Sequence, residues 1–149
     1  MKKTFFLLKV TILYFSITLS FASEKQNYLN KGIELYKNKQ FDESKVIFEK
    51  DLVFNPKSEQ SYLYLAKIFN QNGTEDQQEI NLNNVLLLNP LNDEALYMLI
   101  LLKIEQSDYN LSSELIEKFN LVCKTFCSKK KEIDKVFKKI IPDNEKSNN

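Results

Sequence analysis

The stretch QFDESKVIFEKDLVFNP (Gln40–Pro56) has a counterpart further along the chain, TEDQQEINLNNVLLLNP (Thr74–Pro90). Both stretches end on Asn-Pro after a run of large apolar residues, although the chain has only three prolines. Self-similarity at a period of about 20–50 residues is typical of repeat architectures, in which each repeat is one supersecondary unit. The interval from Pro56 to Pro90 therefore predicts a structural repeat, with a period equal to that interval.

Residues on either side of these stretches keep the same register. Apolar residues recur at helical spacing before and after the polar turn KNKQ (Lys37–Gln40), which predicts two helices in each repeat. Asn55-Pro56 is expected to end the second helix, because proline disfavours the helical conformation in the residue before it. Gly73 supplies the left-handed residue that ends a helix. The residues that align at the interval are Tyr28, Tyr62 and Leu96; Gly32, Ala66 and Ile100; Phe41, Glu75 and Tyr109; and Phe48, Leu82 and Ile116.

The composition favours an all-α protein without a reactive centre. The chain has two glycines, so hairpins and phosphate-binding loops that need positive φ are disfavoured. It has no histidine, which removes histidine-based catalytic triads and metal sites. The candidate catalytic residues that remain are two pairs of carboxylates, Asp42 with Glu43 and Glu75 with Asp76. Both pairs lie at expected helix starts, where acids are favoured electrostatically without any catalytic role. We therefore expect no enzymatic activity and no catalytic, cofactor or metal site.

The aligned residues resemble the tetratricopeptide repeat (TPR), which implies a short right-handed α-solenoid of about three helix-turn-helix units and a C-terminal capping helix. The repeats span residues 25–58, 59–92 and 93–126. The alternative is an ordinary helical bundle in which the similarity between the two stretches arises by chance. The first repeat carries the pattern most fully, with Tyr28, Gly32, Phe41, Ser44, Phe48 and Pro56. The second has Tyr62, Ala66, Gly73 and Pro90, but Glu75 and Gln78 where an aromatic and a small residue belong. The third keeps Tyr109 and Ser112, but has Ile100 and Lys124 in place of the small residue and the proline.

The resemblance also implies a binding surface, because the first helix of each TPR unit lines a concave groove that takes a partner protein or peptide. The implied groove residues here are Leu29, Ile33, Tyr36, Leu63, Lys67, Asn70, Tyr97, Leu101 and Ile104. Family members that hold a C-terminal carboxylate use Lys and Asn in this groove, where this chain has mainly apolar residues. An amphipathic helix or an extended apolar peptide is therefore the expected ligand. The alternative is that the protein's own helices or a second copy cover part of the groove, since apolar patches of that size are rarely exposed.

The N-terminus reads MKKTFFLLKVTILYFSITLSFASEKQ and predicts a secretory signal peptide over residues 1–22, cleaved after Ala22. An uncleaved membrane anchor is the alternative, although Lys9 leaves an apolar run shorter than the roughly 20 residues of a membrane span. Removal of residues 1–22 takes away three lysines and no acid, so the net charge changes from +1 to −2. That balance argues against nucleic acid as a partner. We expect an exported protein, periplasmic or secreted, that acts as an adaptor in envelope complex assembly.

The segment SKKKEIDKVFKKII predicts an amphipathic helix over residues 128–141, followed by a disordered tail over residues 142–149. Its apolar stripe is expected to cover the open end of the repeat array. The alternative is a cationic surface, because residues 124–141 hold seven lysines and two acids. Weak contact of this helix with an anionic surface would suit a membrane-tethered organiser with an uncleaved anchor. The apolar stripe consists of Ile133, Val136, Phe137, Ile140 and Ile141.

Cys123 and Cys127 are the two cysteines of the chain. In an exported protein two cysteines four residues apart most simply form a disulfide. Such a bridge requires the helix to end between them, because the two Cβ atoms must approach to about 4 Å. Two free thiols and a redox pair are the alternatives, although the spacing is not that of the C-x-x-C redox motif.

Overall fold

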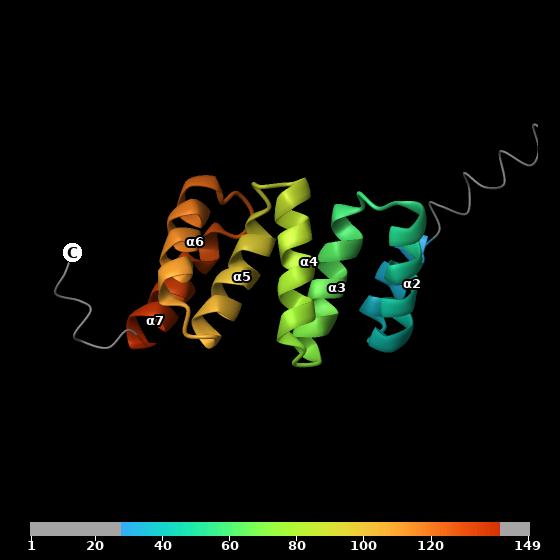
Figure 1. The fold of residues 1–149 in the computed structure, drawn as a ribbon, viewed down its shortest axis with the longest axis horizontal. Coiled ribbons are helices and arrows are strands. Elements are labelled where there is room, and N and C mark those ends of the chain that lie inside the picture. The colour runs from blue at the N-terminus through green and yellow to red at the C-terminus, as the bar shows by residue number, and fades with distance from the viewer. Residues whose placement is uncertain (1–27, 141–149) are drawn as a thin grey trace, which may run out of the picture. The chain divides into compact units, whose positions relative to one another are not determined.

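The computed structural model of the chain describes residues 28–140, and all regular structure within this range is helical (Figure 1). The all-α fold class is confirmed. The predicted signal peptide over residues 1–22, the start of the first repeat and the tail over residues 142–149 lie outside the described residues. The helical segments are residues 28–37, α2 (Phe41–Phe54), α3 (Glu59–Gln71), α4 (Glu75–Leu88), α5 (Asp93–Glu105), α6 (Tyr109–Val122), the 3-10 helix η1 (Cys127–Lys129) and α7 (Lys130–Ile140).

The helices begin in the register that the sequence repeat predicts. The helices α2, α4 and α6 start at the aligned residues Phe41, Glu75 and Tyr109, and α3 and α5 start at Glu59 and Asp93. The chain divides between Tyr64 and Leu65 into two compact units, and the boundary falls inside α3. We call them the N-terminal unit and the C-terminal unit and describe each by itself.

The turn between the two helices of a repeat has the same backbone conformation three times. Lys39, Gly73 and Ser107 occupy the same register position in successive repeats and have φ values of 61°, 66° and 61°. At each turn the left-handed residue donates its N–H to the carbonyl three residues back, and the next residue donates to the carbonyl five residues back. This is the Schellman arrangement that satisfies the free carbonyls of a helix end. The sequence predicts a left-handed residue only at Gly73. The structure shows the same conformation at Lys39 and Ser107, which occupy the same register position.

Glycine at these turns is expected to stabilise the protein. A non-glycine residue in the left-handed region has its Cβ too close to the following carbonyl, at a cost of about 1–2 kcal/mol. Glycine avoids that clash but loses more chain entropy on folding, so we expect Lys39→Gly and Ser107→Gly each to raise the free energy of unfolding by about 0.5–1 kcal/mol. Gly73→Ala should lower it by a similar amount. Urea unfolding followed by circular dichroism measures all three changes, and a loss of stability in both glycine variants would contradict the reasoning.

In the N-terminal unit the helix over residues 28–37 packs closely against α2 at Gly32. A Cβ atom placed on Gly32 would lie 2.6 Å from Cε1 of Phe48, whose side chain has no exposed area. The buried Ser44 hydroxyl donates to the Gly32 carbonyl at 2.8 Å. The Phe48 ring in turn stacks on Tyr64, with centroids 5.0 Å apart. The small residue that the repeat pattern requires here thus makes room for one aromatic ring.

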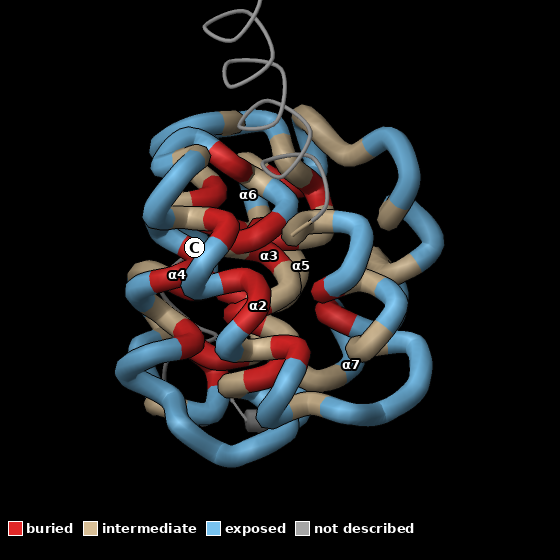
Figure 2. The backbone as a smooth tube through the Cα atoms, turned by 90° about the vertical axis from the view of Figure 1, so that its right-hand side faces the viewer, coloured by how far each residue is buried: buried red, intermediate tan, exposed pale blue. Residues whose placement is uncertain are grey.

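In the C-terminal unit α5 is the central helix and packs against α4, α6 and α7. Burial changes turn by turn along the helices (Figure 2), but α5 is buried over most of its circumference. A helix that is apolar on nearly all sides is stable only when neighbours cover it, which explains why α5 needs three partners. Its fully buried residues include Leu96 and Ile100, and Leu82, Phe119 and Ile133 complete the core from α4, α6 and α7.

The last helix, α7, packs against α5, and Ile133 of the predicted apolar stripe is 1% exposed. Val136 and Phe137 of the predicted stripe are half-buried. Ile141 and the side chain of Ile140 lie outside the described part of the chain. The helix starts at Lys130 rather than at residue 128, because Cys127–Lys129 form a 3-10 turn.

Candidate functional site

The C-terminal unit contains a cavity of about 210 Å³ between α3, α4 and α5. Three of the predicted groove residues, Asn70 from α3 and Tyr97 and Leu101 from α5, line it together. Sites for drug-sized ligands measure about 300–1,000 Å³, so the size of this cavity suits one or two side chains of a partner. Its lining consists of Asn70, Gln78, Tyr97, Met98, Leu101, Leu102 and Glu105.

The other predicted groove residues have different environments. Leu29, Ile33 and Tyr36 are half-buried in the N-terminal unit, where the Tyr36 ring packs against Tyr64 with centroids 5.0 Å apart. Leu63 and Ile104 are core residues with 8% and 2% exposure, so neither presents its side chain to a partner in this conformation. Lys67 forms an ion pair with Glu94, with Nζ and Oε1 2.7 Å apart.

Tyr97 is fixed at the edge of the cavity by three contacts from the C-terminal segment. Its hydroxyl donates to Oε1 of Glu132 at 2.8 Å, its ring lies 5.8 Å from that of Phe126, and Nζ of Lys129 lies 5.3 Å from its centroid. Lys129 also forms an ion pair with Glu132 at 2.7 Å. Burial, followed by the hydrogen bond to the Glu132 carboxylate, raises the pKa of Tyr97. The ring is therefore held in one orientation before any ligand arrives.

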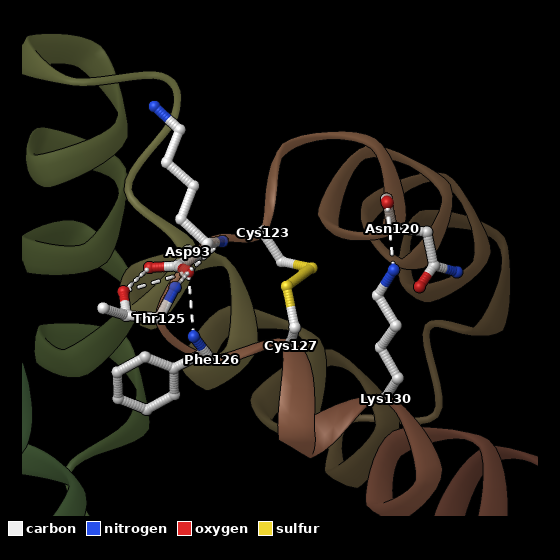
Figure 3. The surroundings of a disulfide bond; sticks show 8 residues. Asp93, Asn120, Cys123, Thr125, Phe126, Cys127 and Lys130 are labelled. Atoms are coloured by element: carbon white, nitrogen blue, oxygen red, sulfur yellow. Dashed lines mark hydrogen bonds between the residues drawn. A yellow bond between two sulfur atoms is a disulfide. The ribbon is translucent and has the colours of Figure 1, made fainter.

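The loop that carries Phe126 is organised by Asp93, the first residue of α5 (Figure 3). Oδ2 of Asp93 accepts the backbone N–H groups of Lys124, Thr125 and Phe126 at 2.6–2.9 Å, and the Thr125 hydroxyl donates to Oδ1 at 2.9 Å. Burial raises the pKa of Asp93, but the hydrogen bonds from Phe126, Lys124 and Thr125 outweigh it and lower the pKa from 3.8 to about 2. The carboxylate thus binds three N–H groups that no helix satisfies.

A disulfide between Cys123 and Cys127 closes the same loop, with the two Cα atoms 5.3 Å apart (Figure 3). The helix break that such a bridge requires is present, because α6 ends at Val122 and Cys123 has an extended backbone. Cys123 and Lys124 occupy the register positions of Asn89 and Pro90. In the third repeat the disulfide and Asp93 therefore terminate the helix where Asn-Pro does so in the first two.

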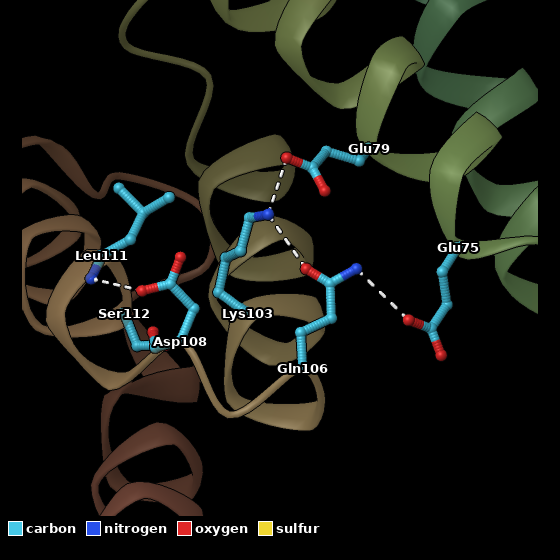
Figure 4. A network of polar contacts seen from close by, with 7 residues as sticks. All are labelled: Glu75, Glu79, Lys103, Gln106, Asp108, Leu111 and Ser112. Atoms are coloured by element: carbon cyan, nitrogen blue, oxygen red, sulfur yellow. Dashed lines mark hydrogen bonds and ion pairs between the residues drawn. The ribbon is translucent and has the colours of Figure 1, made fainter.

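A buried lysine near the C-terminal end of α5, Lys103, links α5 to α4 (Figure 4). Lys103 is 7% exposed and its Nζ lies 2.6 Å from Oε1 of Glu79 and 2.9 Å from Oε1 of Gln106. Gln106 then donates to Oε2 of Glu75 at 3.2 Å. A buried ammonium group is stable only when it is paired and hydrogen-bonded, and this network supplies both. Glu75, a candidate for a catalytic carboxylate on sequence grounds, takes part in this interhelical network.

Other kinds of site find no support between residues 28 and 140. No three cysteine or acidic side chains come together there in a way that could bind a metal ion. Nor does any helix in this range have the length and hydropathy that crossing a bilayer requires.

Two features of the site are not indicated by the repeat pattern of the sequence. These are the loop held by Asp93 and the burial of Lys103. The departure of the third repeat from Asn-Pro at Cys123-Lys124 was a signal that some other group must satisfy this helix end, but the sequence does not say which group. The lysine inside an otherwise apolar segment, LYMLILLKIE (Leu96–Glu105), was a signal for a buried ion pair.

Comparison with models of known protein families gives no match, and none of the curated proteins matches the chain. Among solved structures, the crystal structure of the Sgt2 TPR domain from Aspergillus fumigatus is similar, with a TM-score of 0.65 and 16% sequence identity. The match covers 78% of this chain and 79% of that chain. At this level of identity the similarity concerns the fold and not the ligand. The chain has the helical-repeat fold of a TPR domain.

Proposed function

We propose that the protein is an exported adaptor that binds a peptide or helix of a partner protein in the groove lined by α3 and α5. A TPR-like fold supports a protein-interaction role, as binding sites on such repeats are extended surfaces built from successive helices. The observation that carries the proposal is the cavity, because Asn70, Tyr97 and Leu101 line it together from the first helices of two repeats. Tyr97 is held in place before binding, which lowers the entropy cost of association.

Replacement of Leu101 by aspartate is expected to weaken peptide binding at least tenfold, because a central hot-spot contact of an interface contributes about 2 kcal/mol or more and about 1.4 kcal/mol corresponds to a tenfold change in affinity. The probe is a peptide selected from a displayed random library on the protein without residues 1–22, and fluorescence anisotropy measures the affinity. Leu121→Asp is the matched control, since Leu121 is 86% exposed and does not line the cavity. Leu63→Asp is unsuitable, because Leu63 is buried and its replacement would test folding instead.

Asn70→Arg provides a second test that does not depend on the core. Asn70 is exposed and lines the cavity, so a longer side chain there obstructs the cavity without disturbing packing. If both Leu101→Asp and Asn70→Arg bind the selected peptide as the unmodified protein does, this groove is not the binding site.

Export and envelope assembly belong to the same proposal. The signal-peptide pattern of residues 1–22 and the disulfide support it, because structural disulfides persist in oxidising compartments outside the cytosol. The alternative occupant of the groove is a second copy of this chain, in which case the protein would self-associate.

The second candidate is a membrane-tethered organiser. It is favoured by the exposed lysines of α7, Lys131, Lys135, Lys138 and Lys139, for which the described residues offer no ion-pair partner. A cationic helix face of this kind is attracted to anionic lipid. Mass spectrometry of the exported protein separates the two candidates: an N-terminus at Ser23 supports the adaptor, and one at Met1 supports the tether.

A further inference from the structure

The lining of the cavity carries a negative charge and no positive charge. Glu105 is the only charged residue in its described lining, and it is exposed. Among the described residues the Glu105 carboxylate has no ion-pair or hydrogen-bond partner, whereas the lysines of α3 and α5 both form ion pairs. Lys67 is paired with Glu94 at 2.7 Å, and Lys103 is buried and paired with Glu79 at 2.6 Å. The cavity therefore presents a free carboxylate and no free ammonium group.

An acidic ligand gains nothing at such a site. A partner carboxylate near the cavity would be repelled by Glu105, and at Lys67 it would compete with Glu94. A basic side chain meets Glu105 without displacing any contact. Charge complementarity of this kind selects partners mainly through association rate and through repulsion of the wrong ones.

We propose that the partner segment places one bulky apolar side chain in the cavity and a lysine or arginine beside it that pairs with Glu105. The apolar side chain contacts Tyr97, Met98 and Leu101, which together with Leu102 form the apolar part of the lining. The segment is internal to the partner or amidated, since the site offers no cation to a terminal carboxylate. This inference rests on the proposed groove function and specifies the chemistry of its ligand.

The test uses two synthetic peptides that are identical except at the position next to the apolar anchor, which is lysine in one and glutamate in the other. Their parent is selected from a displayed random library on the unmodified protein. We expect the lysine peptide to bind about tenfold more tightly at low ionic strength and the difference to shrink as salt is added. Glu105→Lys is expected to reverse this preference.

Glu114→Lys is the matched control, because Glu114 is exposed on α6, does not line the cavity and gives the same change in net charge. It should leave the preference unchanged. Equal affinities for the two peptides, or a reversal caused equally by Glu114→Lys, would overturn the inference while leaving groove binding intact if Leu101→Asp still weakens both peptides. If no selected peptide depends on Leu101 or Asn70, the groove function fails and this inference fails with it.

Discussion

Replacement of Gly32 by valine is expected to lower the free energy of unfolding by about 3 kcal/mol, since forcing extra carbon atoms into a filled core typically costs about 1–3 kcal/mol and the branched side chain places this site at the upper end. A Cβ atom alone would lie 2.6–2.9 Å from three ring atoms of Phe48. The ring cannot move aside freely, because it is fully buried and stacked on Tyr64. The gain in helix propensity from replacing glycine, at most about 1 kcal/mol, is too small to compensate.

A double-mutant cycle tests whether the Phe48 ring causes the loss of stability when Gly32 is replaced. The first repeat combines Gly32 with Phe48, and the second has Ala66 and Leu82 at the same register positions, so a larger residue on one helix accompanies a smaller one on the other. Gly32→Ala and Phe48→Leu together recreate the second combination. We expect the double variant to be more stable than the sum of the single effects predicts, by about 1 kcal/mol or more. Additive effects in urea unfolding would show that the clash with Phe48 is not the reason.

Replacement of Asp93 by asparagine is expected to cost about 2 kcal/mol at neutral pH, because the pKa of this carboxyl falls from 3.8 to about 2 in the folded protein and one pKa unit corresponds to about 1.4 kcal/mol. Because the folded-state pKa lies below the unfolded value, the stabilisation is fully present above about pH 4 and is lost as the pH falls towards 2. The stability difference between the two proteins should therefore be constant near neutrality and vanish in acid. Urea unfolding of both proteins across this pH range measures it.

Asp76→Asn is the control for this prediction. Asp76 also lies in the first turn of a helix, α4, but it is exposed and does not hold a loop. Its replacement should cost only about 0.3–1 kcal/mol, the usual contribution of an acid at a helix N-terminus. Similar losses in both variants, or an Asp93→Asn difference that does not change with pH, would mean that the loop hydrogen bonds contribute little.

Much of the architecture was predictable because its signals are local. Asn55-Pro56, Asn89-Pro90 and Gly73 terminate helices through the conformational limits of their own backbones, so their spacing predicts the helix pairs without knowledge of the core. The same register placed Asn70, Tyr97 and Leu101 on the first helices of successive repeats, and these residues share one cavity.

The sequence by itself determined the helix pairs and the apolar stripe through Ile133, because helix ends and helix faces depend on residues within a few positions along the chain. It determined the period and the small residue at Gly32 because these local signals recur at a fixed interval. Only the tertiary structure decided that Asp93 holds the loop at Lys124–Phe126, that Lys103 is buried beside Glu79, and that Leu63 and Ile104 are core residues rather than surface contacts. These outcomes depend on contacts between segments far apart in the chain, 31–33 residues in the case of Asp93 and its loop. A helical pattern shows which face is apolar, but burial and ion pairing depend on what the neighbouring helices place against that face.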